Sequence, residues 1–336
     1  MAQGYFPADY PLLFNGGCFV VWSVNFQRRE ERGSATITAL IVVGVAAVLL
    51  AGLMWRQQIQ IRSLENNRDR IQAQWLQRAA IDFARLVLVE DQRANQYDHL
   101  GEAWALPLAD GKVADFLKNT DIPDEIATVT FNGRLTDAQS LFNLSNLWDR
   151  SFQNVNPAGV KAFERLLDAL GLDKGLAQQT AQSALQAGIP LFDLDSLIKF
   201  PNYSASILEQ LRPFVVILPN VTTINANTAS PEVLMAGISG LSRGAANSFV
   251  QQRTVTPFKS IDEITGLLNK IGGAQGVAID AGLIDVKSQF WLANTEIRLG
   301  RGIFVSSALI QRSPTALPGG NYTQVIWSRT GKIAAD

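Results

Sequence analysis

An uncharged run near the N-terminus is the feature that most constrains this chain. From Ser34 to Met54 the sequence "SATITALIVVGVAAVLLAGLM" carries no charged residue over 21 positions. A helix rises about 1.5 Å per residue, so this run would span about 30 Å, the apolar thickness of a bilayer. The run ends in Leu-Met-Trp-Arg rather than in the small-residue cleavage site of a secretory signal. We therefore predict a retained single-span anchor.

The residues just before the anchor suggest a different kind of processing. Arg28, Arg29 and Arg32 precede Gly33, and Ser34 opens the apolar run. This boundary resembles the site that prepilin peptidase recognises in the type IV pilin-like family, where the enzyme cuts after the glycine and the new N-terminus is methylated. The resemblance implies that residues 1–33 are a leader and that Ser34 is the first mature residue.

The leader is unusually long for a targeting segment. Residues 1–23 contain no Lys or Arg, and no Met lies between Met1 and Met54. We expect the true translation start to lie downstream of Met1, at a non-Met codon such as that of Val24. A genuine long leader is the alternative that the sequence leaves open.

The fifth mature position departs from the pilin-like pattern. Most members of the family carry Glu there, and this chain has Thr38. In the family's usual assembly model that Glu pairs with the N-terminal ammonium of the preceding subunit. The K-type minor pseudopilin of type II secretion also lacks the Glu, and this resemblance implies a subunit at the filament tip with nothing above it.

A second apolar pattern continues the helix beyond the anchor. Ile71, Trp75, Ala79 and Phe83 recur every four residues, with Leu76, Ala80 and Val87 on the adjoining ridge, which is the spacing of one helix face. We predict one helix over residues 34–95, with this stripe packed as core against a sheet.

Strand patterns flank a helical region. Residues 96–150 contain "ATVTF" followed by Asn132-Gly133, a dipeptide typical of hairpin turns. Residues 283–336 alternate apolar and polar side chains and turn at Gly300 and Gly302. The predicted class is therefore α+β, with a pilin-like long N-terminal helix packed on a small antiparallel sheet and a large helical insertion.

The insertion, residues 151–282, contains an internal repeat. "LLDALGLDKGLAQQTAQS" aligns with "LMAGISGLSRGAANSFVQ" with one inserted residue, which predicts two helical hairpins of one design. Asp195 and Ser260 are predicted to begin helices as N-caps. The stretches "GEAWALP", "FNLSNLW" and "INANTASPE" also resemble the K-type pseudopilin.

Composition argues against two other classes of protein. The only Cys and the only His are Cys18 and His99, too few for a disulfide framework or a structural zinc site. A hydrolase would have to pair His99 with Ser242 in "GLSRG", whose flanks look helical rather than strand-like. A helix-hairpin-helix DNA-binding module of a competence-type apparatus is the second alternative, but only three basic residues, Arg243, Arg253 and Lys259, lie near its hairpin.

The resemblance implies a non-enzymatic minor pseudopilin at the tip of the periplasmic pseudopilus. It would sit in the bacterial inner membrane with its head in the periplasm, and would act in pseudopilus initiation and protein export. The implied partners are the I- and J-type minor pseudopilins, other pseudopilins and prepilin peptidase, with no nucleic acid. The resemblance also implies calcium in the head, for which Asp193 and Asp195 are the available carboxylates, although Asp-x-Asp before a helix also serves as a cap.

Overall fold

The computed structural model separates into two compact units, Met1–Ser63 and Leu64–Asp336, and the second is named the head below. Helix α1, Ser34–Ala94, contains residues of both units. By length and composition it is the one helix in the described part of the chain that could cross a membrane. The structure describes residues 34–112, 127–149, 151–188, 191, 193–271, 277–280, 282–300, 302–317 and 320–334.

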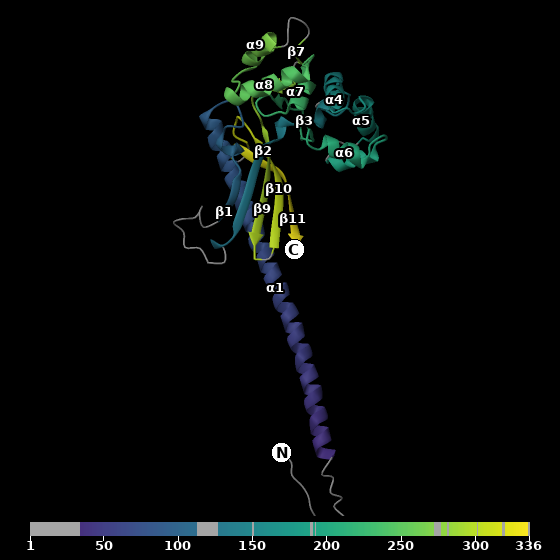
Figure 1. Ribbon diagram of the computed structural model, residues 1–336, viewed down its shortest axis with the longest axis vertical. Helices are drawn as coiled ribbons and strands as arrows, with labels where there is room; N and C mark the ends of the chain where they lie inside the picture. The colour runs from purple at the N-terminus through teal and green to yellow at the C-terminus, as the bar shows by residue number, and fades with distance from the viewer. Residues whose placement is uncertain are drawn as a thin grey trace, which may run out of the picture. The chain divides into compact units, whose positions relative to one another are not determined.

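The head is built on a five-stranded antiparallel sheet in the order β1-β2-β9-β10-β11 (Figure 1). Its strands come from two distant parts of the sequence, as the α+β prediction requires. Gly300, with φ +57°, lies in the tight turn between β9 and β10, where a left-handed backbone favours glycine. The strands are β1 Leu108–Lys112, β2 Thr130–Asp137, β9 Phe290–Leu299, β10 Gly302–Arg312 and β11 Thr323–Ala334.

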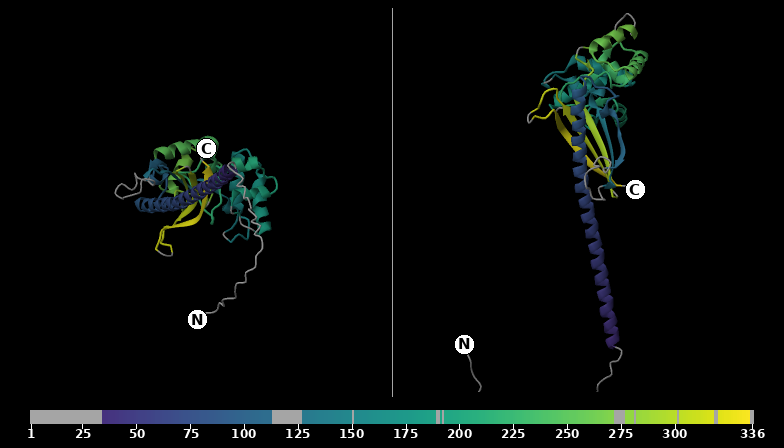
Figure 2. Two further views of the ribbon diagram at one scale, coloured as in Figure 1. Left: turned by 90° about the horizontal axis from the view of Figure 1, so that it is seen from below. Right: turned by 90° about the vertical axis from the view of Figure 1, so that its left-hand side faces the viewer.

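The head portion of α1 covers one face of this sheet (Figure 2). Its buried positions are Ala73, Gln77, Ile81, Ala84 and Leu88. They pack on alternate side chains of β9 and β10 that all point to the same face, namely Trp291, Ala293, Ile297, Phe304, Ala308 and Ile310.

The predicted core stripe on α1 is wrong for its main row, although Leu76 and Val87 of the adjoining ridge do pack against the sheet. Ile71 and Trp75 are 48% and 66% exposed, and Phe83 is 45% exposed. The sheet instead contacts the face that carries Ala73 and Ala84, because small residues let a helix approach a sheet closely. The large side chains of the stripe are left pointing outward.

The Asn132-Gly133 hairpin prediction is also wrong. Both residues lie inside β2, where Asn132 pairs with Glu296 and Gly133 with Thr295 on β9. The close approach of the Phe131 ring explains the glycine, since a Cβ on Gly133 would lie 2.9 Å from that ring.

The helical insertion confirms the two predicted hairpins. They are α4–α5 and α7–α8, and α4 packs against both α5 and α7. Several two-residue strands, β3 to β8, tie the insertion together and to its flanks. The helices are α4 Pro157–Ala169, α5 Gly175–Ala187, the 3₁₀ helix η4 Leu194–Lys199, α6 Ala205–Leu211, α7 Pro231–Gly237, α8 Arg243–Val255 and α9 Ile261–Ile271, and the short strands are β3 Phe142–Asn143, β4 Val215–Val216, β5 Ile224–Asn225, β6 Ile238–Ser239, β7 Ala278–Ile279 and β8 Ile284–Asp285.

Local signals account for most of the helix starts. Ser230 caps α7 with Pro231 in its first turn, and the Ser260 hydroxyl accepts the amide of Glu263 at the start of α9, as predicted. The predicted cap at Asp195 is wrong. Asp193 caps η4 instead, accepting the amide of Ser196 at 2.7 Å.

Candidate functional site: the helix face and the polar seam

The predicted processing site lies at the start of α1. Gly33 is outside the described residues, and Ser34 is the first residue of the helix. The Thr38 hydroxyl donates to the carbonyl of Ala35 at 3.0 Å, so it is satisfied within its own helix. Cleavage after Gly33 and the role of Thr38 remain predictions.

An apolar face of α1 points away from the sheet of the head. Ile71, Trp75 and Leu86 are all exposed, although each is large enough to serve as core. Beside this face lies a groove of about 400 Å³ that Ala80, Phe83, Trp104 and Leu106 help to line. Large apolar side chains exposed on one helix face make this face a candidate for protein contact.

A buried polar cluster, the seam, joins α1, the sheet and the insertion. Arg312 at the end of β10 donates to Asp91 on α1 at 2.8 Å and to Asp98 in the following loop. Its guanidinium also lies 4.2 Å from the ring centre of Trp291. Asp98 in turn accepts the amide of Ser288, just before β9, at 2.7 Å. One cation therefore holds together segments that are far apart in the sequence.

Asp137 is the second centre of the seam. Its Oδ2 accepts hydrogen bonds from Asn225, Thr228 and Ser288 at 2.6 to 3.0 Å, and its Oδ1 accepts the amide of Gln139 at 2.8 Å. Burial raises the pKa of Asp137 to about 6 despite these donors. Burial also raises the pKa of Asp91 to about 6, with the nearby Glu102 carboxylate adding to the effect.

The seam contains a group of three carboxylates. Oxygens of Asp91, Asp98 and Glu102 all lie within 4.8 Å of one another. Glu102 accepts hydrogen bonds from Asn95 and Trp104, both at 2.6 Å, so donors that are close in the sequence stabilise its carboxylate. The sequence analysis missed this group, because only the fold brings Arg312 to these acids.

The asparagines of the sequence motifs tie the insertion together and hold it to the rest of the head. Asn143 and Asn146 of "FNLSNL" form hydrogen bonds with Thr222. The side chain of Asn146 accepts the backbone amide of Thr222 at 3.0 Å and donates to the carbonyl of Thr222 at 2.8 Å. Asn225 of "INANTASPE" enters the seam. Asn227 bonds both backbone groups of Phe258, at 2.8 and 2.9 Å. These motifs are structural latches.

The residues of the two alternative functions have other roles. Ser242 caps α8, and His99 stacks on Tyr97 with ring centres 5.6 Å apart. Among the described residues no hydrogen bond joins the two, so the structure does not assemble the pair that the hydrolase alternative would require. Arg243 is paired with Glu232 at 2.5 Å. Arg253 is buried and donates to the carbonyl of Ala226, and burial lowers its pKa to about 10.

The two acids predicted for calcium are already engaged. Asp193 caps η4, and Asp195 pairs with Arg212 at 2.8 Å. Hard cations are bound by several oxygen ligands, and each of these acids uses one carboxylate oxygen in the contacts just given. Calcium at Asp193 and Asp195 remains a prediction.

An apolar N-terminal helix continues into the head and packs on an antiparallel sheet, and hydrogen bonds hold a helical insertion to that sheet. This arrangement defines a pilin-like subunit. Residues 224–287 match the family model "Type II secretion system (T2SS), protein K". Type II secretion system protein K of Pseudomonas aeruginosa is 30% identical over 315 residues, covering 83% of this chain and 89% of that protein. The chain belongs to the type II secretion system protein K family.

Two further comparisons agree with this assignment. Type II secretion system protein K of Aeromonas hydrophila is 25% identical over 246 residues, covering 61% of this chain and 69% of that protein. A chain in the crystal structure of the GspK-GspI-GspJ complex from enterotoxigenic Escherichia coli superposes with a TM-score of 0.61 at 19% identity. The superposition covers 80% of this chain and 98% of that one, and it shows a shared fold.

Proposed function

We propose that this chain is a minor pseudopilin at the tip of the periplasmic pseudopilus, acting in pseudopilus initiation and protein export. It has no catalytic role of its own; chemistry is done to it, by cleavage between Gly33 and Ser34 and methylation of the new N-terminus. α1 anchors it in the inner membrane, with the head in the periplasm. We further propose that the mature chain is divided into four segments, residues 34–95, 96–150, 151–282 and 283–336. Strands of the second segment pair with strands of the fourth in one sheet, which supports treating the third segment as an insertion.

The outward apolar face of α1 is the observation that carries this proposal. Ile71, Trp75 and Leu86 are exposed in the head, so only contact with another chain would bury their apolar surface. The fully buried core of a stable interface is typically apolar and often holds a Trp. The proposed occupants are the helices of the I- and J-type minor pseudopilins, and the E. coli relative was crystallised in such a complex.

A crosslinking experiment in cells tests the proposal. A photo-crosslinking amino acid replaces Trp75 in the full-length chain, and in a matched control it replaces the neighbouring exposed Gln74. We expect crosslinks to the I- or J-type pseudopilin from position 75 and far fewer from position 74. Equal crosslinking from the two positions, or none to these partners, would reject this face as the docking surface.

The competence-type alternative is not favoured. Arg243 and Arg253, two of the three cations near the predicted hairpin, are committed to Glu232 and to a buried carbonyl. A phosphate-binding hairpin needs such groups free to face the nucleic acid. Submicromolar affinity for duplex DNA at about 0.15 M salt, measured on the detergent-solubilised chain, would restore this alternative.

A further inference from the structure

The last strand of the sheet, β11, has a free edge. It forms one margin of the sheet (Figure 1), and its register with β10 is unbroken from the pair Leu309–Trp327 to the pair Gly302–Ala334. In the described part of the chain no strand pairs with its other side. Alternate residues of an antiparallel edge strand point their backbone N–H and C=O groups away from the sheet. Such a row of groups can pair with one more strand, which is a recurring way of binding an extended segment.

A cation lies at this edge on the face of the sheet that points away from α1. Ala308 packs toward α1, so the adjacent Ser307 and its cross-strand partner Arg329 point to the opposite face. Arg329 is exposed, and its guanidinium lies 5.1 Å from the ring centre of Trp327 on the same strand. Among the described residues it forms no ion pair. Its charge is therefore available to a ligand at the edge.

On the face toward α1, a groove rich in hydrogen-bond donors runs beside β11. Gln77 and Arg78 of α1 line it together with Ser328 and Thr330 of β11. Arg78 is exposed and has no ion-pair partner within the described residues. Gln77 is only 3% exposed, yet its side-chain amide forms no hydrogen bond in the part of the chain that the structure describes. Buried amides normally have a partner, and here the groove leaves room for a ligand to supply one.

The charges on the two faces select an acidic partner. Asp82, the acid among the described residues that line the groove, pairs with Arg85 at 2.9 Å, so it does not neutralise Arg78. A carboxylate accepts hydrogen bonds from both guanidinium and amide groups. Pairing between two copies of β11 is disfavoured, because each strand carries Arg329 and Lys332 and no acid to offset them.

We propose that the free edge of β11 binds an extended, acidic segment of another protein, which adds a strand to the sheet. The side chains of an added strand alternate between the two faces. Carboxylates on one face then meet Arg78 and Gln77, and carboxylates on the other meet Arg329. Ile71, Trp75 and Leu86 are not among the residues that line the groove, so this surface is separate from the docking face on α1.

Synthetic peptides test this inference on the full chain in detergent. The probe is a labelled peptide of about eight residues that alternates Thr with Glu, a length suited to one strand. One control replaces Glu by Lys, and a second keeps Glu but carries a methyl group on every backbone nitrogen. We expect fluorescence anisotropy to show binding of the Thr-Glu peptide about 10-fold tighter than either control. Equal binding of the methylated peptide, or no binding of the Thr-Glu peptide, would overturn strand addition.

Charge reversal at the edge tests which residues recognise the acids. Arg78→Glu and Arg329→Glu should each weaken binding of the Thr-Glu peptide about 10-fold, and the double variant should prefer the Thr-Lys peptide. Arg134→Glu is the matched control, since Arg134 is exposed in the same cross-strand row as Arg329 but lies on β2. All variants should melt at the temperature of the parent chain. Equal losses in Arg134→Glu and Arg329→Glu would overturn the assignment to the edge.

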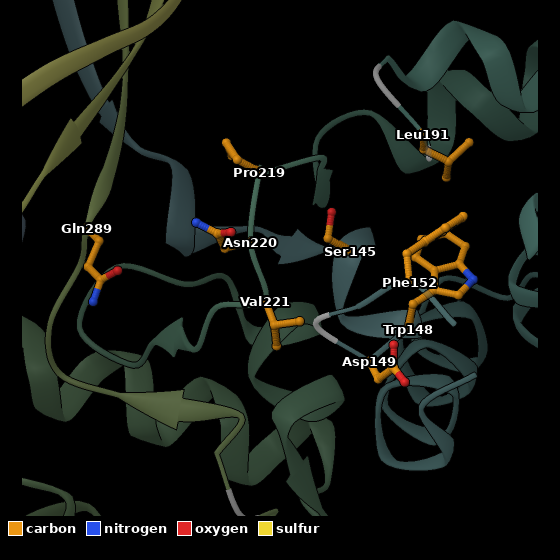
Figure 3. A pocket seen from close by; sticks show the side chains of 9 residues that line it. All are labelled: Ser145, Trp148, Asp149, Phe152, Leu191, Pro219, Asn220, Val221 and Gln289. Carbon is orange, nitrogen blue, oxygen red and sulfur yellow. The ribbon is translucent and has the colours of Figure 1, made fainter. Parts of the chain in front are cut away.

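The pocket shown in Figure 3 is the competing place for such a peptide. It lies beside the chain that enters β9, and Val221 is part of its wall. Val221→Trp would fill part of this pocket and should leave binding of the Thr-Glu peptide unchanged. Loss of binding in Val221→Trp, with normal binding in Arg78→Glu and Arg329→Glu, would place the peptide in the pocket and reject β11 as its site.

Discussion

The guanidinium of Arg312 lies 2.8 Å from the carboxylate of Asp91, across 221 positions of sequence. This contact joins the end of β10 to the last turns of α1. Both side chains are over nine-tenths buried, so the pair is shielded from water and salt. The sheet, the long helix and the loop at Asp98 thus meet at one cation.

Removal of that cation should strongly destabilise the head. Arg312→Met keeps the volume of the side chain but leaves Asp91 and Asp98 buried without their counter-charge. Breaking a buried ion pair from one side costs about 3–5 kcal/mol. We expect a loss of this size in the free energy of unfolding, measured by urea denaturation of the full chain in detergent.

A second arginine on the same sheet provides the control. Arg298 on β9 pairs with Glu296 at 2.9 Å, but its side chain is 59% exposed. Exposed pairs contribute about 0–1 kcal/mol. Arg298→Met should therefore change the stability little, and equal losses in the two variants would contradict the special role of the seam.

The seam should also make stability depend on pH. The pKa of Asp137 is raised from 3.8 to about 6 in the folded chain, so the folded state holds a proton that the unfolded state releases. Its contribution is therefore fully present below about pH 4 and is lost as the pH rises through 6. A shift of this size corresponds to about 2–3 kcal/mol. We expect the melting temperature to fall between pH 5 and pH 7.5.

Two matched variants isolate this effect. Asp137→Asn cannot ionise, so it should flatten the fall in melting temperature between pH 5 and pH 7.5. Asp149→Asn is the control, because the pKa of Asp149 is lowered to about 2 and that residue stays ionised across the whole interval. An unchanged pH profile in Asp137→Asn would show that Asp137 is not a source of the dependence.

Two glycines should respond in opposite ways to the same substitution. A Cβ on Gly159, in the first turn of α4, would lie 1.8 Å from the carbonyl oxygen of Asn146. Gly159→Ala should therefore force α4 away from the "FNLSNL" latch and lower the melting temperature by several degrees. Gly244 in α8 has nothing within 4 Å of its Cβ position, so Gly244→Ala should be neutral or stabilise by up to about 1 kcal/mol. Equal effects would contradict the close approach at Gly159.

Sequence patterns predicted those parts of the fold that depend on local chemistry. The uncharged run, the paired hairpins and the Gly300 turn each follow from residues close together in the chain. The face of α1 that contacts the sheet could not be predicted, because an i, i+4 stripe does not reveal whether its partner is the sheet or another protein. The seam was missed for a similar reason, since Asp91, Asp137 and Arg312 carry no shared spacing and are brought together only by strand pairing and by the packing of α1 on the sheet.

Processing at the start of α1 gives a prediction about the mature terminus. Peptidase cleavage after Gly33 requires a residue without a bulky side chain, so Gly33→Leu should leave the leader attached. The parent chain, extracted from membranes of cells with active prepilin peptidase, should have the intact mass of residues 34–336 plus one methyl group. Recovery of an unprocessed parent chain from such cells would reject the cleavage site.

Thr38 distinguishes a subunit at the tip from one inside the filament. In the assembly model that the family resemblance implies, an internal subunit uses a carboxylate at the fifth mature position to neutralise the N-terminal ammonium of its neighbour, whereas a tip subunit has no neighbour above it. The Thr38 hydroxyl bonds the Ala35 carbonyl of its own helix, so its loss in Thr38→Ala should leave secretion and crosslinking to the I- and J-type partners nearly normal.

Thr38→Glu is the complementary test of the same assignment. It would place an unpaired carboxylate in the apolar helix, which costs about 3 kcal/mol for an acid at the bilayer centre and less near the rim. We therefore expect it to be neutral or harmful for secretion, measured alongside Thr38→Ala in one strain. If Thr38→Ala blocks assembly while Thr38→Glu improves it, the subunit lies inside the filament. Only there would the N-terminal ammonium of a neighbouring subunit stabilise the added carboxylate.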